Sequence, residues 1–263
     1  MCLVLIAFES HPRFSIILAA NRDEFYDRPT AAAAFWPEAP AVLAGRDLRA
    51  SGTWLGIDRA GRFAAVTNYR QGEREPAAPR SRGRLVSDFL TSGMDARMYL
   101  KQVAREAEQY NGFNLLVGDT GQLWYFSNRE GRIRGLSPRV YGLSNHLLDS
   151  PWPKVTAGKH ALGALLLEAA PELGSGLLRL LSDRHQSADH LLPTTGVGLA
   201  WERLLSSAFI SSPDYGTRSS TAVLVAHDGR VSFIEQSFGP GGTPAGQAHY
   251  EFALGGSQST AFT

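Results

Sequence analysis

Hydrophobic residues occur in short runs that polar turns separate along most of the chain. The first two runs, 3–8 and 14–20, flank the polar segment 9–13, which predicts a hairpin of two strands buried on both faces. Later segments predict three further hairpins, with strands at 53–58 and 62–69, at 113–117 and 122–127, and at 220–226 and 231–236. The last of them turns at Asp228-Gly229, a strong hairpin signal.

Other segments carry the periodicity of helices. In 96–110, Met98, Val103, Ala107 and Tyr110 mark one face. Helices are also predicted at 85–90, 152–168, 177–181 and 200–209, and short strands near 133 and at 140–143. Hairpins instead of crossovers predict an α+β fold, with antiparallel sheets covered by helices. We expect one domain over 1–263, with a loosely packed tail from about 239 that is rich in Gly, Ala, Ser and Thr.

Composition narrows the class of protein. Of the 263 residues, 43% are hydrophobic and 19% charged, which is typical of a globular protein. The net charge is +1 and the Lys and Arg residues are scattered, so no nucleic-acid partner is expected. The run 3–8 is too short for a signal peptide, and no segment reaches the length of a membrane span. One cysteine excludes a disulfide framework and fits a reducing cytoplasm, and no His, Asp or Glu cluster has metal-ligand spacing.

That single cysteine, Cys2, directly follows the initiator methionine. Removal of Met1 would give Cys2 both a thiol and a free α-amine. The amine has an unperturbed pKa of roughly 7.7–8.0, which suits a base near neutral pH. A thiol needs such a base, or a positive neighbour, to become a reactive thiolate. The pattern therefore predicts an N-terminal nucleophile, and the alternative is a small apolar residue that opens a strand.

Partners for such a nucleophile are expected where apolar strands end. Asn21, Arg22, Asp23 and Glu24 come directly after the second apolar run, and a hairpin around 9–13 would place Cys2 opposite Ala20–Asn21. Asp23 could then orient the amine or thiol, and Arg22 could lower the pKa of the thiol. The alternative is a charged turn with surface ion pairs of little energetic value.

Two asparagines and one arginine complete the candidate set. Asn68 ends the predicted strand 62–69 and Asn145 follows 140–143, and the side-chain NH2 of asparagine can donate to an oxyanion. Arg218, at the start of the last hairpin, could bind a carboxylate or steady a thiolate. The alternatives are local turn bonds for the asparagines and a solvated side chain for Arg218.

Together these motifs resemble the NRDE family, the transport and Golgi organization proteins. The resemblance spans nearly the whole chain and rests on the Met-Cys opening and on the motifs Asn21-Arg22-Asp23-Glu24, Ser51-Gly52-Thr53-Trp54-Leu55-Gly56, Val66-Thr67-Asn68-Tyr69 and Tyr215-Gly216-Thr217-Arg218. It implies an intracellular protein linked to haem trafficking and lipid homeostasis.

More distantly, the chain resembles N-terminal-nucleophile hydrolases of the choloylglycine hydrolase and penicillin V acylase type. This resemblance implies a four-layer αββα sandwich in which Cys2 attacks a linear amide. Asp23, Asn68, Asn145 and Arg218 match the assisting residues. The hydrolases usually carry an arginine three residues before the aspartate, where this chain has Ala20, and Arg22 beside Asp23 would point the other way in an extended strand.

Three functions follow as expectations. The first is amide hydrolysis or acyl transfer on a small acylated substrate, with no cofactor required. The second is haem binding or transfer, with Cys2 thiolate or His146 as an axial ligand. The third is a non-catalytic scaffold in trafficking. Either an acyl-amide or another apolar ligand is expected to contact aromatic residues, namely Phe25, Tyr26, Trp36, Tyr69 and Trp152.

Overall fold

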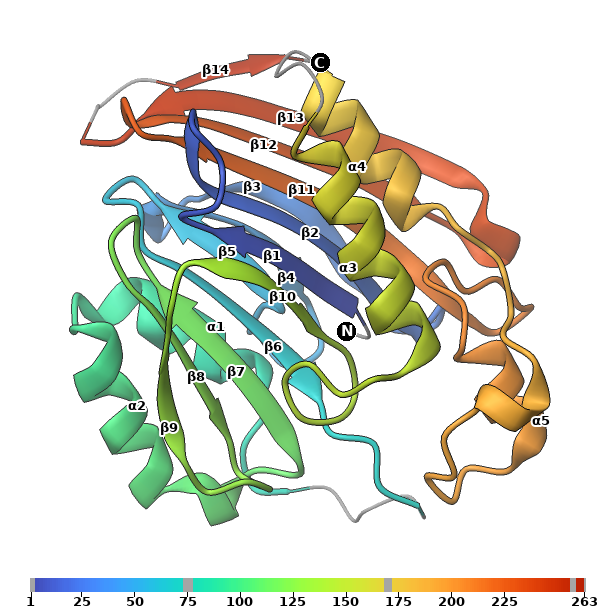
Figure 1. The fold of residues 1–263 in the computed structure, drawn as a ribbon. Helices are drawn as coiled ribbons and strands as arrows, with labels where there is room; N and C mark the ends of the chain where they lie inside the picture. The colour runs from blue at the N-terminus through green and yellow to red at the C-terminus, as the bar shows by residue number, and fades with distance from the viewer. Residues whose placement is uncertain (1–2, 73–77, 168–171, 256–258, 263) are drawn as a thin grey trace.

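The computed structural model describes residues 3–72, 78–167, 172–255 and 259–262. Its centre is a pair of antiparallel seven-stranded sheets that lie face to face (Figure 1). The first sheet has the order β10 (Arg139–Leu143), β1 (Leu3–Phe8), β2 (Phe14–Phe25), β11 (Tyr215–Ala226), β12 (Arg230–Phe238), β13 (Pro244–Ala253) and β14 (Ser259–Phe262). The second has the order β3 (Thr30–Trp36), β4 (Ala39–Asp47), β5 (Leu55–Asp58), β6 (Phe63–Asn68), β7 (Phe113–Gly118), β8 (Leu123–Ser127) and β9 (Ile133–Leu136).

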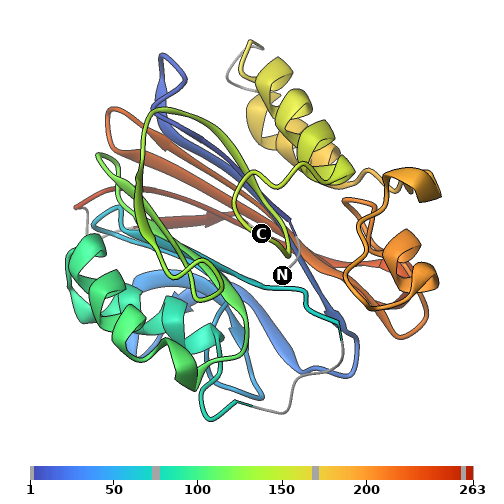
Figure 2. The same cartoon turned by 60° about the horizontal axis from the view of Figure 1, so that its bottom comes forward.

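Helices cover the outer faces of both sheets (Figure 2). In the described residues there are five α-helices: α1 (Gly83–Ser92), α2 (Ala96–Arg105), α3 (Pro153–Leu165), α4 (Leu173–Leu181) and α5 (Leu199–Leu204). The apolar faces of α1 and α2 pack on the second sheet, and those of α3 and α4 pack on the first. The predicted α+β class and the αββα order of layers are therefore confirmed.

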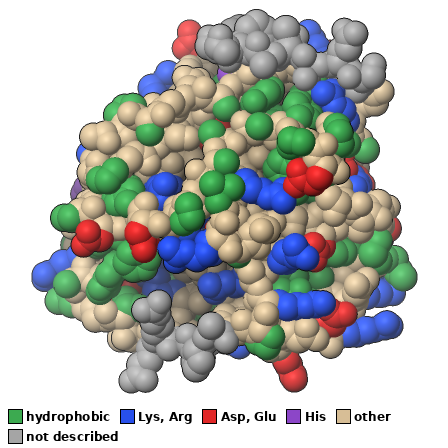
Figure 3. Space-filling view, turned by 180° about the vertical axis from the view of Figure 1, so that it is seen from behind, with side chains coloured by type: hydrophobic (Ala, Val, Ile, Leu, Met, Phe, Trp, Pro, Cys, Tyr) green, Lys and Arg blue, Asp and Glu red, His purple; other side chains and the backbone are tan. Residues whose placement is uncertain are grey.

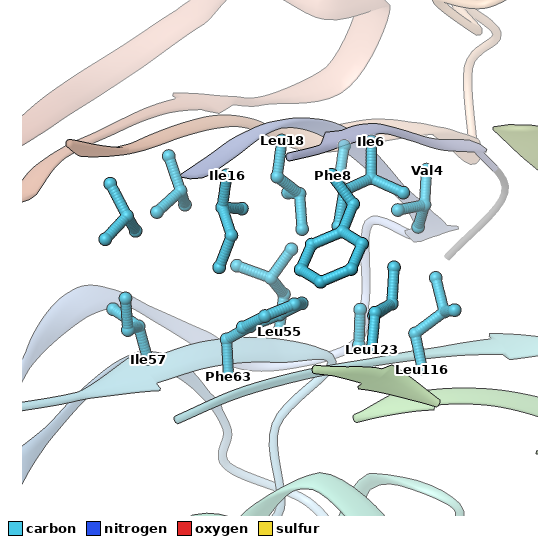
Figure 4. Close-up of a cluster of buried hydrophobic side chains, with 14 of the residues drawn as sticks. Val4, Ile6, Phe8, Ile16, Leu18, Leu55, Ile57, Phe63, Leu116 and Leu123 are labelled. Atoms are coloured by element: carbon cyan, nitrogen blue, oxygen red, sulfur yellow. The ribbon is translucent and has the colours of Figure 1, made fainter. Parts of the chain in front are cut away.

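The alternation of side chains along β1 shows why its sequence is apolar throughout. Val4, Ile6 and Phe8 point between the sheets, where they meet residues of the second sheet such as Phe63 (Figure 4). The intervening residues of β1 point to the opposite face and pack under α3 and α4. Because both faces are covered, every position of β1 is buried and a continuous hydrophobic run results.

Four strand assignments differ from the expectations. β2 continues past Ala20 to Phe25, so the Asn-Arg-Asp-Glu motif lies inside a strand and not in a turn after it. Strands β3 and β4 were not predicted, and the expected loose tail from 239 was wrong for 244–253, because β13 pairs with β12 along its length.

The register of the first hairpin also differs. Leu3 pairs with Asn21 and Val4 with Ala20, so Ala20–Asn21 lies opposite residues 3 and 4 and not opposite Cys2. Phe8 pairs with Ile16, so the hairpin is centred on residue 12. This centre lies one residue after the middle of the segment 9–13.

The surface shows a mixture of side-chain types. On the face seen in Figure 3, basic side chains are interspersed with acidic and hydrophobic ones. None of the helices in the described part of the chain combines the length and the apolar character that a membrane crossing requires.

Candidate functional site

The site is built around the first described residue of β1. Leu3 pairs with Asn21 on one side, and its neighbour Val4 pairs with Leu143 at the end of β10 on the other. Cys2, the predicted nucleophile, lies outside the described residues. Its chain neighbour Leu3 is thus held between the end of β10 and the polar half of β2.

Asp23 is the candidate with the most unusual surroundings. It is 3% exposed, and its Oδ1 accepts a hydrogen bond of 2.7 Å from the Thr217 hydroxyl on the neighbouring strand β11. Its other carboxylate oxygen, Oδ2, is buried and has no hydrogen-bond partner among the described residues. Burial of a carboxylate oxygen without a hydrogen-bond donor costs free energy. Oδ2 of Asp23 can therefore accept a hydrogen bond from a further donor.

Asn21, in contrast, is fully satisfied. Its Nδ2 donates to the backbone oxygens of Leu181 at 2.8 Å and Ala208 at 2.7 Å, and its Oδ1 accepts from the Ser220 hydroxyl. These bonds tie β2 to the end of α4 and to β11. Asn21 therefore anchors the strand that carries Asp23.

Arg22 points to the other face of β2, as the alternation of a strand requires. Its guanidinium stacks 4.3 Å over the ring of Trp54, and Nη1 donates to the Thr30 hydroxyl at 3.0 Å. Burial lowers the pKa of this guanidinium, with Glu24 and Asp47 acting in the opposite direction. Arg22 is thus on the inner face of the sheet, while Asp23 is on the helix-covered face.

A second buried carboxyl lies on that inner face, and sequence reasoning missed it. Glu235 of β12 is 2% exposed, and it accepts hydrogen bonds from the Ala33 N–H and the Thr221 hydroxyl. Burial raises the pKa of Glu235 to about 7. The strand pattern carried a signal for it, because Val231 and Phe233 mark the inward positions and Glu235 is the next in that series.

The two candidate asparagines meet at the point where the sheets join. Nδ2 of Asn145 donates to the backbone oxygen of Asn68 at 2.9 Å, and the Thr67 hydroxyl donates to the backbone oxygen of Ser144 at 2.7 Å. These bonds, which we call the polar seam, connect the end of β6 to the chain just after β10. Asn145 is buried, whereas the side chain of Asn68 is exposed and free to meet a ligand.

Arg70 supports this seam, and no sequence motif pointed to it. Its backbone N–H donates to the Asn145 oxygen at 2.6 Å, and its guanidinium forms a 2.9 Å ion pair with Glu202 of α5. The two side chains of this ion pair are only 9% and 5% exposed. The guanidinium also stacks on Trp152 at 4.7 Å, so a pair separated by 132 residues fixes α5 next to the seam.

His146 directly follows Asn145 but is held by other groups. Its Nδ1 lies 2.7 Å from the Ser150 hydroxyl, and its ring stacks between Tyr69 at 5.0 Å and Trp152 at 5.7 Å. Burial lowers the pKa of this imidazole, which favours the neutral form. Haem ligation by His146 stays a prediction, and the described residues contain no group of three or more His, Asp or Glu suited to a metal ion.

Arg218 lies apart from the asparagines, at the bulge of β11. Its Nη1 donates to three backbone oxygens of the segment after Asp23, those of Phe25, Tyr26 and Arg28, at 3.0, 3.3 and 3.0 Å. Its Nε is buried and has no hydrogen-bond partner among the described residues. The guanidinium thus holds the turn that follows β2, and its predicted role toward a thiolate or a ligand carboxylate stays a prediction.

Comparison with known proteins places this arrangement in a family. The model of the family "Transport and Golgi organisation 2" matches residues 1–240. A bovine Transport and Golgi organization protein 2 homolog is 42% identical, over 90% of this chain and 93% of that protein. The Drosophila melanogaster Transport and Golgi organization protein 2 is 31% identical, over 90% of this chain and 92% of that protein. The chain belongs to the Transport and Golgi organisation 2 family.

Solved structures show where else the fold of this family member occurs. A Caenorhabditis elegans ortholog of N-acylethanolamine-hydrolyzing acid amidase aligns with a TM-score of 0.50 and 10% identity, over 85% of this chain and 92% of that chain. Penicillin V acylase from Agrobacterium tumefaciens aligns with a TM-score of 0.51 and 12% identity, over 88% and 82%. At these identities the likeness shows the fold alone, which is that of N-terminal-nucleophile hydrolases.

The aromatic residues expected around a ligand do not gather in one pocket. Trp36 lies in the core under α1 and α2, and Phe25 is 47% exposed, with its ring against Tyr215. Tyr69 and Trp152 do both lie against the His146 ring. The expectation was wrong for Trp36, because its ring packs into the core beneath the helices.

Proposed function

We propose that this protein is an N-terminal cysteine amidohydrolase or acyltransferase that acts on a small acylated substrate. The observation that carries the proposal is the buried Oδ2 of Asp23, which has no donor among the described residues. Asp23 lies on β2 two residues after Asn21, the partner of Leu3. An α-ammonium group on Cys2 would supply the donor that this carboxylate oxygen lacks.

In the proposed reaction, the thiol of Cys2 attacks the carbonyl carbon of the amide, and the α-amine accepts the thiol proton. A carbon–sulfur bond forms and the carbonyl oxygen becomes an oxyanion. When the carbon–nitrogen bond breaks, the α-ammonium returns the proton to the leaving amine. Water, or a second amine in acyl transfer, then attacks the thioester and releases the thiol.

Asn68 is the group best placed to stabilise the oxyanion. Its side chain is exposed at the end of β6, while its backbone oxygen is fixed by the 2.9 Å bond from Asn145. Donors held in position before the reaction cost little reorganisation when negative charge develops. Asn145 therefore acts chiefly as a positioning residue for Asn68.

Two arginines have supporting roles in the proposed reaction. Arg22 presents a buried guanidinium on the inner face, and a nearby positive charge lowers the pKa of a thiol. Arg218 fixes the turn 25–28 that follows Asp23. A reducing cytoplasm, which the single cysteine favours, would keep the thiol available for this chemistry.

The test begins with the intact mass of the purified protein, before and after brief treatment with dilute iodoacetamide at neutral pH. Loss of Met1 and fast alkylation of Cys2 are expected, and a panel of N-acyl amides should then show thiol-dependent release of the amine. Cys2→Ser should abolish this release, while its circular dichroism spectrum matches that of the wild type.

Retention of Met1, or a thiol that alkylates no faster than a free cysteine at the same pH, would contradict the proposal. Amide turnover that survives in Cys2→Ser would contradict it as well. The expectations of haem transfer and of a non-catalytic scaffold would then be the ones to test.

A further inference from the structure

A polar cleft lies where the second half of β2 faces the start of α1. Its lining includes Arg22 and Glu24 of β2 and Arg28 of the turn after β2, together with Asp47, Trp54 and Gly83. Two sequence motifs, Asn21-Arg22-Asp23-Glu24 and Ser51-Gly52-Thr53-Trp54, thus each contribute residues to one cavity.

Arg22 enters this cleft as a buried cation with unused donors. The residue is 5% exposed, and Nη1 donates to Thr30 while the guanidinium plane stacks on Trp54. Its Nε and Nη2 make no hydrogen bond, and no carboxylate lies within ion-pair distance, among the described residues. A buried guanidinium presents its donors as a rigid fork that matches an oxyanion.

The acidic residues of the cleft do not neutralise Arg22. Asp47 forms a bidentate pair with Arg28, at 2.6 Å for Nη2–Oδ2, and also accepts from the backbone N–H groups of Arg49 and Ala50. Glu24 approaches Arg28 to 4.0 Å. These two acids therefore make their short contacts with Arg28 and form no ion pair with Arg22, although their charges oppose the effect of burial on the pKa of its guanidinium.

The start of α1 adds further donors on the opposite wall. This helix has ten residues, no side-chain cap at its N-terminus and no acidic residue in its first turn. The N–H of Gly83 makes no hydrogen bond among the described residues, whereas its carbonyl oxygen accepts from the Thr53 N–H at 3.1 Å. The N–H groups of Arg84 and Leu85 already donate to the backbone oxygens of Ser81 and Arg82, so the N–H of Gly83 and the helix dipole are what favour a negative charge at this end.

We infer that this cleft binds one oxyanionic group, a carboxylate or a phosphate carried by a small ligand, between the guanidinium of Arg22 and the start of α1. The cleft holds about 100 Å³, which suits a single such group. Asn68 also lines it, so the anionic group lies beside the residue proposed to stabilise the oxyanion. Binding of this group does not depend on a reactive thiol, so it can be tested apart from the proposed function.

The test uses Trp54 emission, since this ring lies directly under the Arg22 guanidinium. The full-length protein is titrated at constant ionic strength with N-acetylglycine, with inorganic phosphate and with the neutral analogue N-acetylglycinamide. We expect a saturable change with at least one of the anions and none with the neutral amide. Trp54→Phe should remove the optical signal and so assign it to this ring.

Arg22→Lys keeps the charge but loses the fork, and should weaken anion binding by about tenfold. The matched control is Arg46→Lys, because Arg46 also stacks on a tryptophan, Trp36, at 4.0 Å but does not line the cleft. It should leave binding unchanged. Cys2→Ala should also leave anion binding unchanged, which separates this inference from the amide chemistry.

Equal responses to N-acetylglycine, phosphate and N-acetylglycinamide in the wild type would overturn the inference, and this comparison holds even if Arg22→Lys fails to fold. Wild-type affinity in a folded Arg22→Lys variant would overturn it too. Tighter binding of N-acetylglycine would assign the site to carboxylates, and tighter binding of phosphate would assign it to phosphate groups.

Discussion

The two halves of β2 are equally buried and chemically opposite. Residues 16–20 are apolar and pack against the other sheet and the helices, whereas Asn21, Arg22 and Asp23 are polar and 5% exposed or less. In the apolar half, every side chain has close neighbours of its own kind. In the polar half, the buried atoms Asp23 Oδ2 and, on the next strand, Ser219 Oγ lack partners among the described residues.

Burial therefore has opposite effects on stability at different positions of one strand. Apolar burial stabilises the fold by about 25 cal/mol per Å² of surface removed from water. Burial of an unpaired polar atom costs roughly 1–3 kcal/mol. The unpaired Oδ2 of Asp23 therefore lowers stability locally and is explained by what it can bind, whereas the fully hydrogen-bonded Asn21 contributes to folding.

The largest effect is expected from the removal of a large side chain that packs between the sheets, in the same core cluster as the apolar half of β2. Phe63 is 3% exposed and lies between the sheets, so Phe63→Ala should lower the free energy of unfolding by about 3–5 kcal/mol. Urea unfolding measures this loss. The control is Phe25→Ala, whose ring is 47% exposed and which should cost less than about 1 kcal/mol. Equal losses in both variants would contradict the conclusion that apolar burial between the sheets stabilises the fold.

The second prediction concerns pH and Glu235 of β12, which lies on the same inner face as Arg22. Its pKa is raised from 4.5 to about 7, so the folded state binds a proton that the unfolded state has released between these values. The free energy of unfolding should therefore fall as pH rises from about 4.5 to 7, by up to about 3 kcal/mol from this group, and then level off.

Urea unfolding at several pH values checks this slope. Glu235→Gln should flatten the pH dependence in that window, while the matched control Glu108→Gln, at an exposed position, should keep it. A Glu235→Gln variant with the wild-type slope would show that this carboxyl is already ionised in the folded protein.

A third, smaller effect on stability is expected where the segment between β4 and β5 packs against the start of α1. A Cβ on Gly52 would lie 2.5 Å from the backbone carbon of Gly83, so Gly52→Ala forces the start of α1 away and should cost about 1–3 kcal/mol. Gly163→Ala is the control, since its Cβ meets nothing within 4 Å and it lies in a helix. Thermal unfolding should therefore show a lower midpoint for the first variant and an unchanged or higher one for the second.

The smallest effect on stability, and the sharpest on chemistry, is expected at Asp23. Asp23→Asn keeps the shape and an oxygen to accept from Thr217, so the free energy of unfolding should change by less than about 1 kcal/mol. Without the negative charge, the proposed α-ammonium loses its partner, and alkylation of Cys2 should slow by at least about tenfold. The control Asp27→Asn changes a side chain that is 76% exposed. Equal alkylation rates in the two variants would remove Asp23 from the proposed mechanism.

The sequence predicted those strands whose own residues are strongly apolar or β-branched. Residues 3–8 and 63–68 are examples, and their burial on both faces gives a continuous signal. Strand β3 was missed because 31–34 is a run of alanines with low β-propensity, and it becomes a strand only through pairing with β4. The polar strand β13 depends on pairing with β12 in the same way.

For the site, the sequence identified positions but not contacts. Asn68 and Asn145 were recognised as strand-end residues, yet the bond between them forms only when the two sheets dock. Arg70 and Glu202 carry no local pattern at all, because each is an ordinary charged residue until the fold brings them together. Arg218 was recognised, but its contacts with the turn after β2 follow from a bulge that no composition predicts.

The polar seam at Asn145 and Thr67 also determines how freely the rest of the sandwich can change. Directional bonds fix the position of one sheet against the other at that end, whereas the apolar core is held by contacts without direction. Methyl groups far from the seam can therefore be exchanged over evolutionary time, and the sheets can repack slightly there, without moving Asn68. Sequence drift in the core and a constant geometry at the seam are compatible within one small protein.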